Sequence, residues 1–306
     1  EFLFSLPDMN NSKKLKTCMS FFVLLLLLIP DAGLTGEEGG LTEDTRLQDL
    51  IRKADRVAKE ARTENRTEER LWDAIGLYRD ILEVDPENRH ALNRLSLGYF
   101  TLAEAYVEEP EKKKTYYAKG YEYGLKSLKF NEEFAELYGD QGFEALKNLP
   151  ETVEDVEAVF WTGANLGRLG ETKGILDSLG DLPALVALNR RAVSLDETYL
   201  GGGAHRALGS IGGELLGRRP VTIMQINKYD LSWGKAKKHF ERAIELAPNC
   251  LENYFSYAKY YALKRGKKGT ARDLLDEVLE SPVGEEYPLI NKIAKEKARK
   301  LKQERF

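Results

Sequence analysis

Two stretches of this chain carry the same residue pattern, and this pattern limits the folds that the chain can adopt. In residues 71–86 (LWDAIGLYRDILEVDP), an alanine, an aromatic residue, an apolar residue and a proline follow one another at spacings of four, three and five. Residues 234–248 (GKAKKHFERAIELAP) repeat this order at the same spacings. Spacings of three and four place side chains on one face of an α-helix, and a proline stops the helix. The pattern therefore predicts two amphipathic helices of one design, in which small residues let a neighbouring helix approach.

This spacing is typical of the second helix of a tetratricopeptide repeat (TPR). Residues 91–106 and 253–261 have the character of first helices, and residues 184–196 and 273–282 resemble degenerate repeat helices. The two clear units are not separated by a multiple of the roughly 34-residue repeat. We therefore expect paired repeats separated by divergent helical pairs. The alternative is a plain helical bundle in which the matches arose by chance.

Helical periodicity extends through most of the chain. Apolar residues recur at helical spacing from Leu47 to Leu301, and only residues 220–226 (PVTIMQI) have the character of a strand. One strand cannot form a sheet, so we interpret that stretch as an extended loop. Hydrophobic residues make up 42% of the chain, which is enough for a core without disulfides or metals. We expect an all-α fold, an α-solenoid of TPR-like helix pairs with about a dozen helices, in a single domain at 41–306.

The first 40 residues have a different character. A cluster of three lysines precedes the apolar run FFVLLLLLI at 21–29, which is too short for the roughly 20 residues that span a bilayer. A basic cluster before a short apolar run is typical of a secretory signal peptide. We expect residues 1–40 to comprise an N-terminal extension, a signal peptide and a linker, and the protein to be exported. A retained membrane anchor is the alternative. No cysteine stands directly after the apolar run, where a bacterial lipoprotein would carry one, so lipid attachment would require a different start or processing site.

The sequence lacks the motifs of several common catalytic sites, namely HEXXH, CxxC, a Walker A loop and GxSxG. None of its three histidines lies at helical ligand spacing from another histidine or a cysteine. Its 46 basic and 50 acidic residues give a net charge of −4, which argues against nucleic-acid binding. We expect a protein that is not an enzyme, with no catalytic residue, metal or cofactor. A helical hydrolase with a hidden carboxylate pair is the enzymatic alternative.

Two glycine-rich segments depart from ordinary repeat composition, residues 160–170 (FWTGANLGRLG) and 199–213 (YLGGGAHRALGSIGG). Glycine inside a helix costs about 1 kcal/mol relative to alanine, so these glycines need a reason. Close helix packing is one reason, and room for a ligand or another chain is the other. The side chains that we predict to line a binding face are Trp161, Asn165, Arg168, His205, Arg206, Tyr254 and Tyr257. Structural roles remain the alternative, above all for His205 and the tyrosines.

Three segments together carry a family resemblance: FWTGANLGRLG, LGGGAHRALGSIGGELLG and KAKKHFERAIELAPNCLENYFSYAKYYAL. Placed among degenerate repeats, they resemble TatT, the TPR-containing T component associated with tripartite ATP-independent periplasmic (TRAP) transporters. The resemblance covers about residues 45–285. Its most specific part is the glycine-rich GAHR segment followed by KAKKHFERAIELAP.

The resemblance implies a periplasmic scaffold that is not an enzyme and that associates with the solute-binding protein of a TRAP transporter. It also implies a homotrimer that binds or passes a small, hydrophobic ligand. The charge balance argues against a nucleic-acid partner. The alternative function is that of a generic exported TPR adaptor, which would bind a peptide segment in an envelope complex.

Overall fold

The computed structural model describes residues 43–62, 67–150, 155–174, 177–218 and 222–306, so the predictions for residues 1–40 lie outside the described residues. The described residues form thirteen α-helices, two 3-10 helices and one π-helical turn, with no strand among them. The helices are α1 (Glu43–Arg62), α2 (Glu68–Val84), α3 (Arg89–Ala105), α4 (Pro110–Leu128), α5 (Glu132–Gln141), η1 (Gly142–Lys147), α6 (Val156–Lys173), η2 (Leu179–Asp181), α7 (Leu182–Asp196), α8 (Tyr199–Leu216), α9 (Ile223–Lys228), α10 (Trp233–Leu246), α11 (Leu251–Tyr257), the π-helical turn η3 (Ala258–Ala262), α12 (Lys268–Glu280) and α13 (Pro288–Arg305). The prediction of an all-α fold with about a dozen helices is confirmed.

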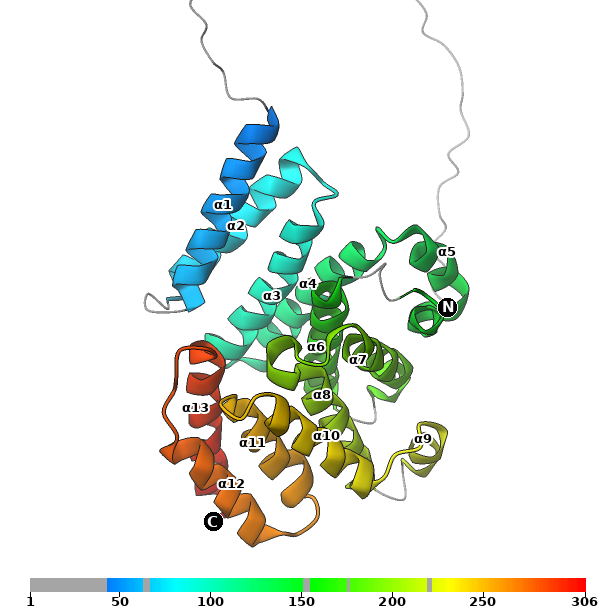
Figure 1. The fold of residues 1–306 in the computed structure, drawn as a ribbon, viewed down its shortest axis with the longest axis vertical. Coiled ribbons are helices and arrows are strands. Elements are labelled where there is room, and N and C mark those ends of the chain that lie inside the picture. The colour runs from blue at the N-terminus through cyan, green and yellow to red at the C-terminus, as the bar shows by residue number, and fades with distance from the viewer. Residues whose placement is uncertain (1–42, 63–66, 151–154, 175–176, 219–221) are drawn as a thin grey trace, which may run out of the picture. The chain divides into compact units, whose positions relative to one another are not determined.

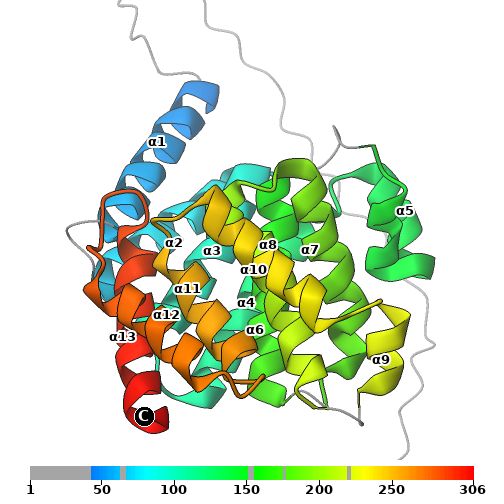
Figure 2. The ribbon, with the colours of Figure 1, turned by 60° about the horizontal axis from the view of Figure 1, so that its bottom comes forward.

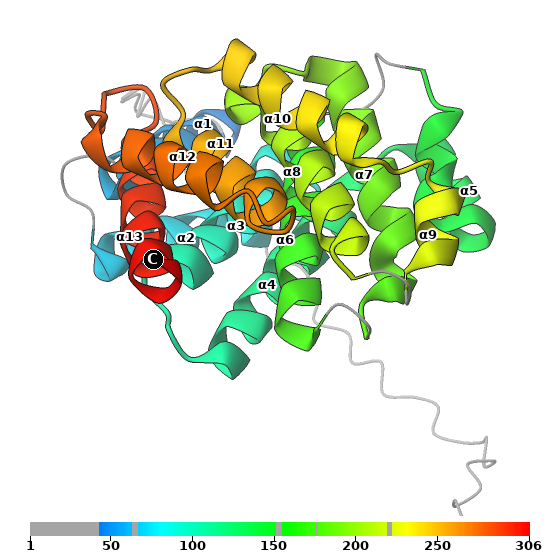
Figure 3. The same ribbon diagram turned by 90° about the horizontal axis from the view of Figure 1, so that it is seen from below.

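Helices that follow one another in the chain pack against one another, as expected of an α-solenoid. The packed pairs run from α1 on α2 to α3 on α4, then through α6 and α7 to α8, and from α10 to α13. Figure 2 shows α10 lying over α8, and α8 is the helix that α10 contacts most extensively. The last helix, α13, lies beside α12 in Figures 1 and 3 and also contacts α3. Lys297 Nζ of α13 lies 2.6 Å from Glu104 Oε2 of α3, so residues far apart in sequence meet inside the stack.

The aromatic position of the predicted repeat is a core position in the structure. Phe240 is fully buried between α8 and α10, and its ring stacks on Tyr257 with centroids 5.3 Å apart. Ala236 and Ala243, which precede and follow Phe240 on the same face of α10, are also buried. In the earlier unit Tyr78 is buried. The small and aromatic residues therefore fill the space between stacked helices, as the repeat spacing predicts.

Two glycines of α8 are required by close packing. Gly202 has a positive φ of 71°, and a Cβ there would lie 2.8 Å from Ala243 Cα of α10. A Cβ on Gly213 would lie 1.9 Å from the carbonyl oxygen of Tyr260 in η3. Real Cβ atoms do not approach other atoms so closely, so only glycine lets α8 approach both neighbours. This packing positions one face of α8 against the rest of the stack.

The interpretation of residues 220–226 as an extended loop is wrong where the structure describes them. Residues 223–226 begin the short helix α9, and residues 220–221 lie outside the described residues. Ile226 is buried against α7 and α8, in a cluster that includes Leu182 and Leu215. This apolar contact overrides the strand propensity of the Val-Thr-Ile stretch.

The helices in the described ranges include none with the length and apolar character that a membrane crossing requires.

Candidate functional site

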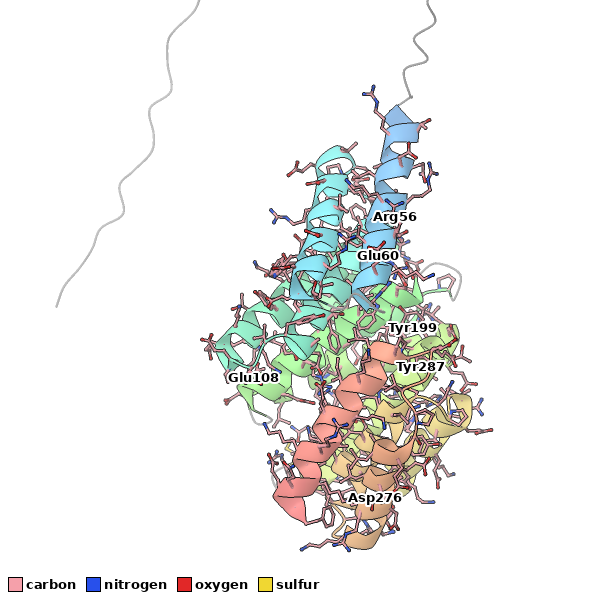
Figure 4. All side chains as sticks on the ribbon, turned by 90° about the vertical axis from the view of Figure 1, so that its left-hand side faces the viewer. Arg56, Glu60, Glu108, Tyr199, Asp276 and Tyr287 are labelled. Carbon is pink, nitrogen blue, oxygen red and sulfur yellow. The ribbon has the colours of Figure 1, made fainter. Side chains whose placement is uncertain are left out.

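A cavity of about 810 Å³ lies among the helices and is partly open to solvent. Residues of α1, α3, α6, α7, α8, α11, η3 and α13 line it. Its volume is within the range of roughly 300–1,000 Å³ that is usual for small-molecule sites. Figure 4 shows two of its lining residues, Tyr199 and Tyr287, between the C-terminal end of α1 and the N-terminal end of α13.

Much of the cavity wall is apolar. The apolar side chains that line it come from five helices and from the segment before α7, and they include Leu97, Phe100, Phe160, Trp161, Ala164, Leu179, Leu182, Leu185, Leu200, Ala207, Ile211, Leu215, Leu289, Ile290 and Ile293. The two glycine-rich segments contribute Gly163, Gly167, Gly170 and Gly203. A Cβ on Gly203 would lie 2.7 Å from the ring of Phe160, and a Cβ on Gly163 would lie 3.3 Å from Leu188 Cβ of α7, so these glycines let α6, α7 and α8 pack closely around the cavity. The wall can therefore hold the apolar part of a small molecule.

One wall of the cavity carries a network of buried charges centred on Glu104 of α3. Its carboxylate accepts hydrogen bonds from Lys297 Nζ at 2.6 Å and from the hydroxyl of Tyr117 at 2.6 Å, and it forms an ion pair with Arg168 Nε at 3.0 Å. Burial alone would raise the pKa of Glu104, but Arg168 and Lys297 hold it well below its usual range. Glu104 is therefore ionised at neutral pH and links α3 to α4, α6 and α13.

The network continues along α6 to the π-helical turn. Glu171 accepts a hydrogen bond from the Tyr260 hydroxyl at 3.0 Å and lies 2.9 Å from Arg168 Nη1. Lys259 Nζ lies 2.9 Å from the same hydroxyl. Burial would raise the pKa of Glu171, but Arg168 and Lys259 lower it overall. Turns of π-helix are frequent at functional sites, and here the turn places Lys259 and Tyr260 at the cavity wall.

A second polar cluster lies where α1, α3, α6 and α8 meet. Arg94 Nη1 and Glu157 Oε1 form an ion pair at 3.2 Å, and the Tyr199 hydroxyl donates to the same carboxylate at 3.3 Å. Trp161 Nε1 donates to that hydroxyl at 3.1 Å. Burial, and then the charge of Glu157, raises the pKa of Tyr199, so the hydroxyl keeps its proton. Arg62, the last residue of α1, also lines the cavity here.

Three of the side chains predicted from the sequence line this cavity: Trp161, Arg168 and Arg206. Trp161 packs against Phe100 with ring centroids 5.3 Å apart. Arg206 Nη1 donates to Asn253 Oδ1 at 2.6 Å, which fixes the guanidinium against α11. The structure thus brings these three residues, from two glycine-rich segments, to a single cavity.

Four other predicted residues lie elsewhere. Asn165 is buried between α6 and α3, where its amide donates to the backbone oxygen of Ser96 at 3.2 Å. The Nδ1 atoms of His205 and His239 lie 2.9 Å apart, and neither ring lines the cavity. Tyr257 stacks on the buried Phe240, and Tyr254 packs in the apolar cluster of α11, α12 and α13. These positions correspond to structural contacts inside the stack.

The sequence pattern does not mark several of the residues that line the cavity. Lys297 occurs in a lysine-rich stretch of the kind that usually faces solvent, and nothing nearby marks it as a cavity residue. Glu104 offered a weak signal, because it is a single carboxylate within the apolar stretch LGYFTLAEAY. Its partners Arg168 and Lys297 are far away in sequence. Only the tertiary fold brings these charges together.

The cavity is suited to binding a solute because it combines an extended apolar wall with charged groups held in place by ion pairs. Within the described residues, no group of three or more His, Cys, Asp or Glu side chains could hold a metal ion. Cys250 is fully buried, and burial raises the pKa of its thiol, so it is a poor nucleophile.

The chain matches a known protein family over most of its length. A family model described as TAtT, TRAP transporter T-component, matches residues 73–305. The matched residues include all of α3 to α12 and nearly all of the cavity wall, whereas α1 lies outside them. No curated protein matches the chain.

Proposed function

This chain belongs to the TRAP transporter T-component family and has an accessory role in TRAP transport, and we propose that it acts as a scaffold for the solute-binding receptor of such a transporter. In this proposal the protein is exported, works in the periplasm as a homotrimer and carries out no chemistry itself. The match of the family model over residues 73–305 is the single observation that carries the proposal.

The cavity supports a second part of the proposal, that the scaffold binds or passes a small ligand. An unfilled apolar cavity lowers the stability of a protein, because side chains that filled the space would stabilise it. A cavity with apolar side chains from five helices therefore indicates a role other than stability. Several of the charges on the wall are arranged in opposite pairs, as with Glu104 and Lys297. Such pairs hold the helices at fixed positions around the space. We propose that the ligand of the transporter occupies this space while the receptor is bound.

Affinity capture tests the receptor part. Tagged protein is expressed in its native host and recovered from the envelope fraction, and its partners are identified by mass spectrometry. We expect the solute-binding protein of a TRAP transporter to co-purify. Recovery of peptide-bearing envelope proteins without any such receptor would instead favour the generic TPR adaptor.

A cavity variant tests the ligand part. Arg206→Met keeps most of the side-chain volume but removes the guanidinium that binds Asn253 at 2.6 Å. We expect the receptor still to be captured, and the amount of any co-purifying small molecule to fall. Arg272→Met on α12, which is exposed and does not line the cavity, is the matched control. Equal recovery of the small molecule with both variants would contradict a ligand site at Arg206.

A further inference from the structure

Arg62 is a cavity-lining arginine for which the described residues supply neither an ion pair nor a hydrogen bond. It ends α1 and lines the cavity, with most of its side chain covered. No carboxylate of the described residues lies within ion-pair distance of its guanidinium, and none of them makes a hydrogen bond with it. Burial, and then the charge of Arg94, lowers the pKa of Arg62. An arginine nevertheless stays protonated in a protein, so this position carries a full positive charge.

The carboxylates closest to Arg62 in the polar cluster are used by other partners. Arg94 uses Glu157, a carboxylate that lines the cavity, in its ion pair at 3.2 Å. The other nearby carboxylate, Asp55, accepts from the Tyr78 hydroxyl at 2.7 Å and lies 2.8 Å from His90 Nε2, and it does not line the cavity. Arg94 therefore has a carboxylate partner on the cavity side, whereas Arg62 has none among the described residues. A covered charge without a partner is unfavourable, and an anion bound beside it removes that penalty.

The surroundings of Arg62 indicate the shape of that anion. The apolar wall begins directly beside the cluster, with Leu97, Phe100 and Phe160 lining the same cavity. The planar fork of a guanidinium matches the two oxygens of a carboxylate. One carboxylate also matches the single positive charge of Arg62, whereas a phosphate monoester would bring more than one negative charge.

We propose that Arg62 and Arg94 bind the carboxylate of an aliphatic monocarboxylic acid, with its hydrocarbon along the apolar wall of the cavity. This inference rests on the ligand part of the proposed function, and it assigns the acid end of the ligand to particular residues. The primary contact comes from α1, which lies outside the residues that the family model matches. The acid end of the site is thus a feature that the N-terminal helix of this chain adds to the cavity.

Isothermal titration calorimetry of the full chain tests this proposal, with octanoate and 1-octanol as the probes. Octanol has the same hydrocarbon length and lacks the charge. We expect saturable binding of octanoate that weakens as salt is added, and at least tenfold weaker binding of octanol. Arg62→Gln should weaken octanoate binding about tenfold or more and leave octanol binding within about twofold, since only the charged contact is lost.

Two further variants serve as controls. Arg62→Lys keeps the charge without the fork, so its affinity for octanoate should fall between those of the wild type and Arg62→Gln. Arg56 lies on the same helix, is exposed and does not line the cavity, so Arg56→Gln should bind octanoate normally (Figure 4). Far-UV circular dichroism verifies that each variant is folded.

Three results would overturn the proposal: equal affinity of the wild type for octanol and octanoate, unchanged octanoate affinity in Arg62→Gln, or no binding of butanoate, octanoate or dodecanoate by the wild type. None of these results affects capture of the receptor. Failure of the acid site is therefore distinguishable from failure of the proposed function.

Discussion

Replacing Glu104 by glutamine tests whether the charge network on the cavity wall holds the helix stack together. Glu104 is mostly buried and contacts Arg168 at 3.0 Å and Lys297 at 2.6 Å. Removing one partner of a buried ion pair typically costs about 3–5 kcal/mol, because a buried charge is left without compensation. Here Arg168 keeps Glu171 at 2.9 Å, and Lys297 keeps Glu252 at 3.7 Å. We therefore expect Glu104→Gln to lower the free energy of unfolding by about 2–3 kcal/mol.

Urea denaturation followed by far-UV circular dichroism measures this loss at pH 7. The deficit should shrink as the pH falls below about 4.5, because the folded state keeps Glu104 ionised at pH values where the unfolded chain takes up the proton. Glu108→Gln is the matched control, since Glu108 lies just past the end of α3 and is exposed (Figure 4). It should change stability by less than about 0.5 kcal/mol. If Glu104→Gln is as stable as this control at pH 7, the network does not stabilise the stack and the reasoning is refuted.

Three further predictions concern the packing of α8 and α10. Phe240→Ala should cost about 3–5 kcal/mol in urea denaturation, because the ring is fully buried, and a loss below about 1 kcal/mol would contradict the repeat register. Gly213→Ala should lower the melting temperature, since its Cβ would lie 1.9 Å from a backbone oxygen. Gly76→Ala is the control and should be neutral or stabilising, because a Cβ at Gly76 would have nothing within 4 Å. A lower melting temperature for Gly76→Ala than for Gly213→Ala would refute the packing argument. Burial and the neighbouring His205 lower the pKa of His239 to about 4, so stability should fall as the pH drops from 6.5 towards 4. His239→Gln should show a smaller fall in melting temperature between pH 7 and pH 5, and equal falls would contradict this assignment.

The helical repeat could be predicted from the sequence because its signal is local. Ala236, Phe240 and Ala243 lie on one face of one helix, and their burial follows from that spacing. The interpretation of residues 220–226 was wrong because local propensity favours a strand there. The contact of Ile226 with α7 and α8 decides the helical conformation instead, and it depends on residues distant in sequence.

The candidate site could be predicted only in part, for the same reason. The glycines of residues 160–170 stood out, and with them Trp161 and Arg168, because glycine in a helix needs an explanation. Glu104 and Lys297 meet across the whole stack, at 193 residues of separation. Arg62 is one of several arginines in α1, a helix whose many charged residues are typical of a solvent-exposed surface. Such residues become recognisable only when the fold places them on a common cavity.

Sedimentation velocity of the purified protein mixed with the purified solute-binding receptor of its transporter tests the central claim most directly. The account predicts a complex that sediments faster than either protein alone and that contains both chains. It also predicts that the complex persists in Arg62→Gln, because the acid end of the cavity is not the proposed receptor contact. Independent sedimentation of the two wild-type proteins at every concentration tested would contradict the claim that this protein is a scaffold for the receptor.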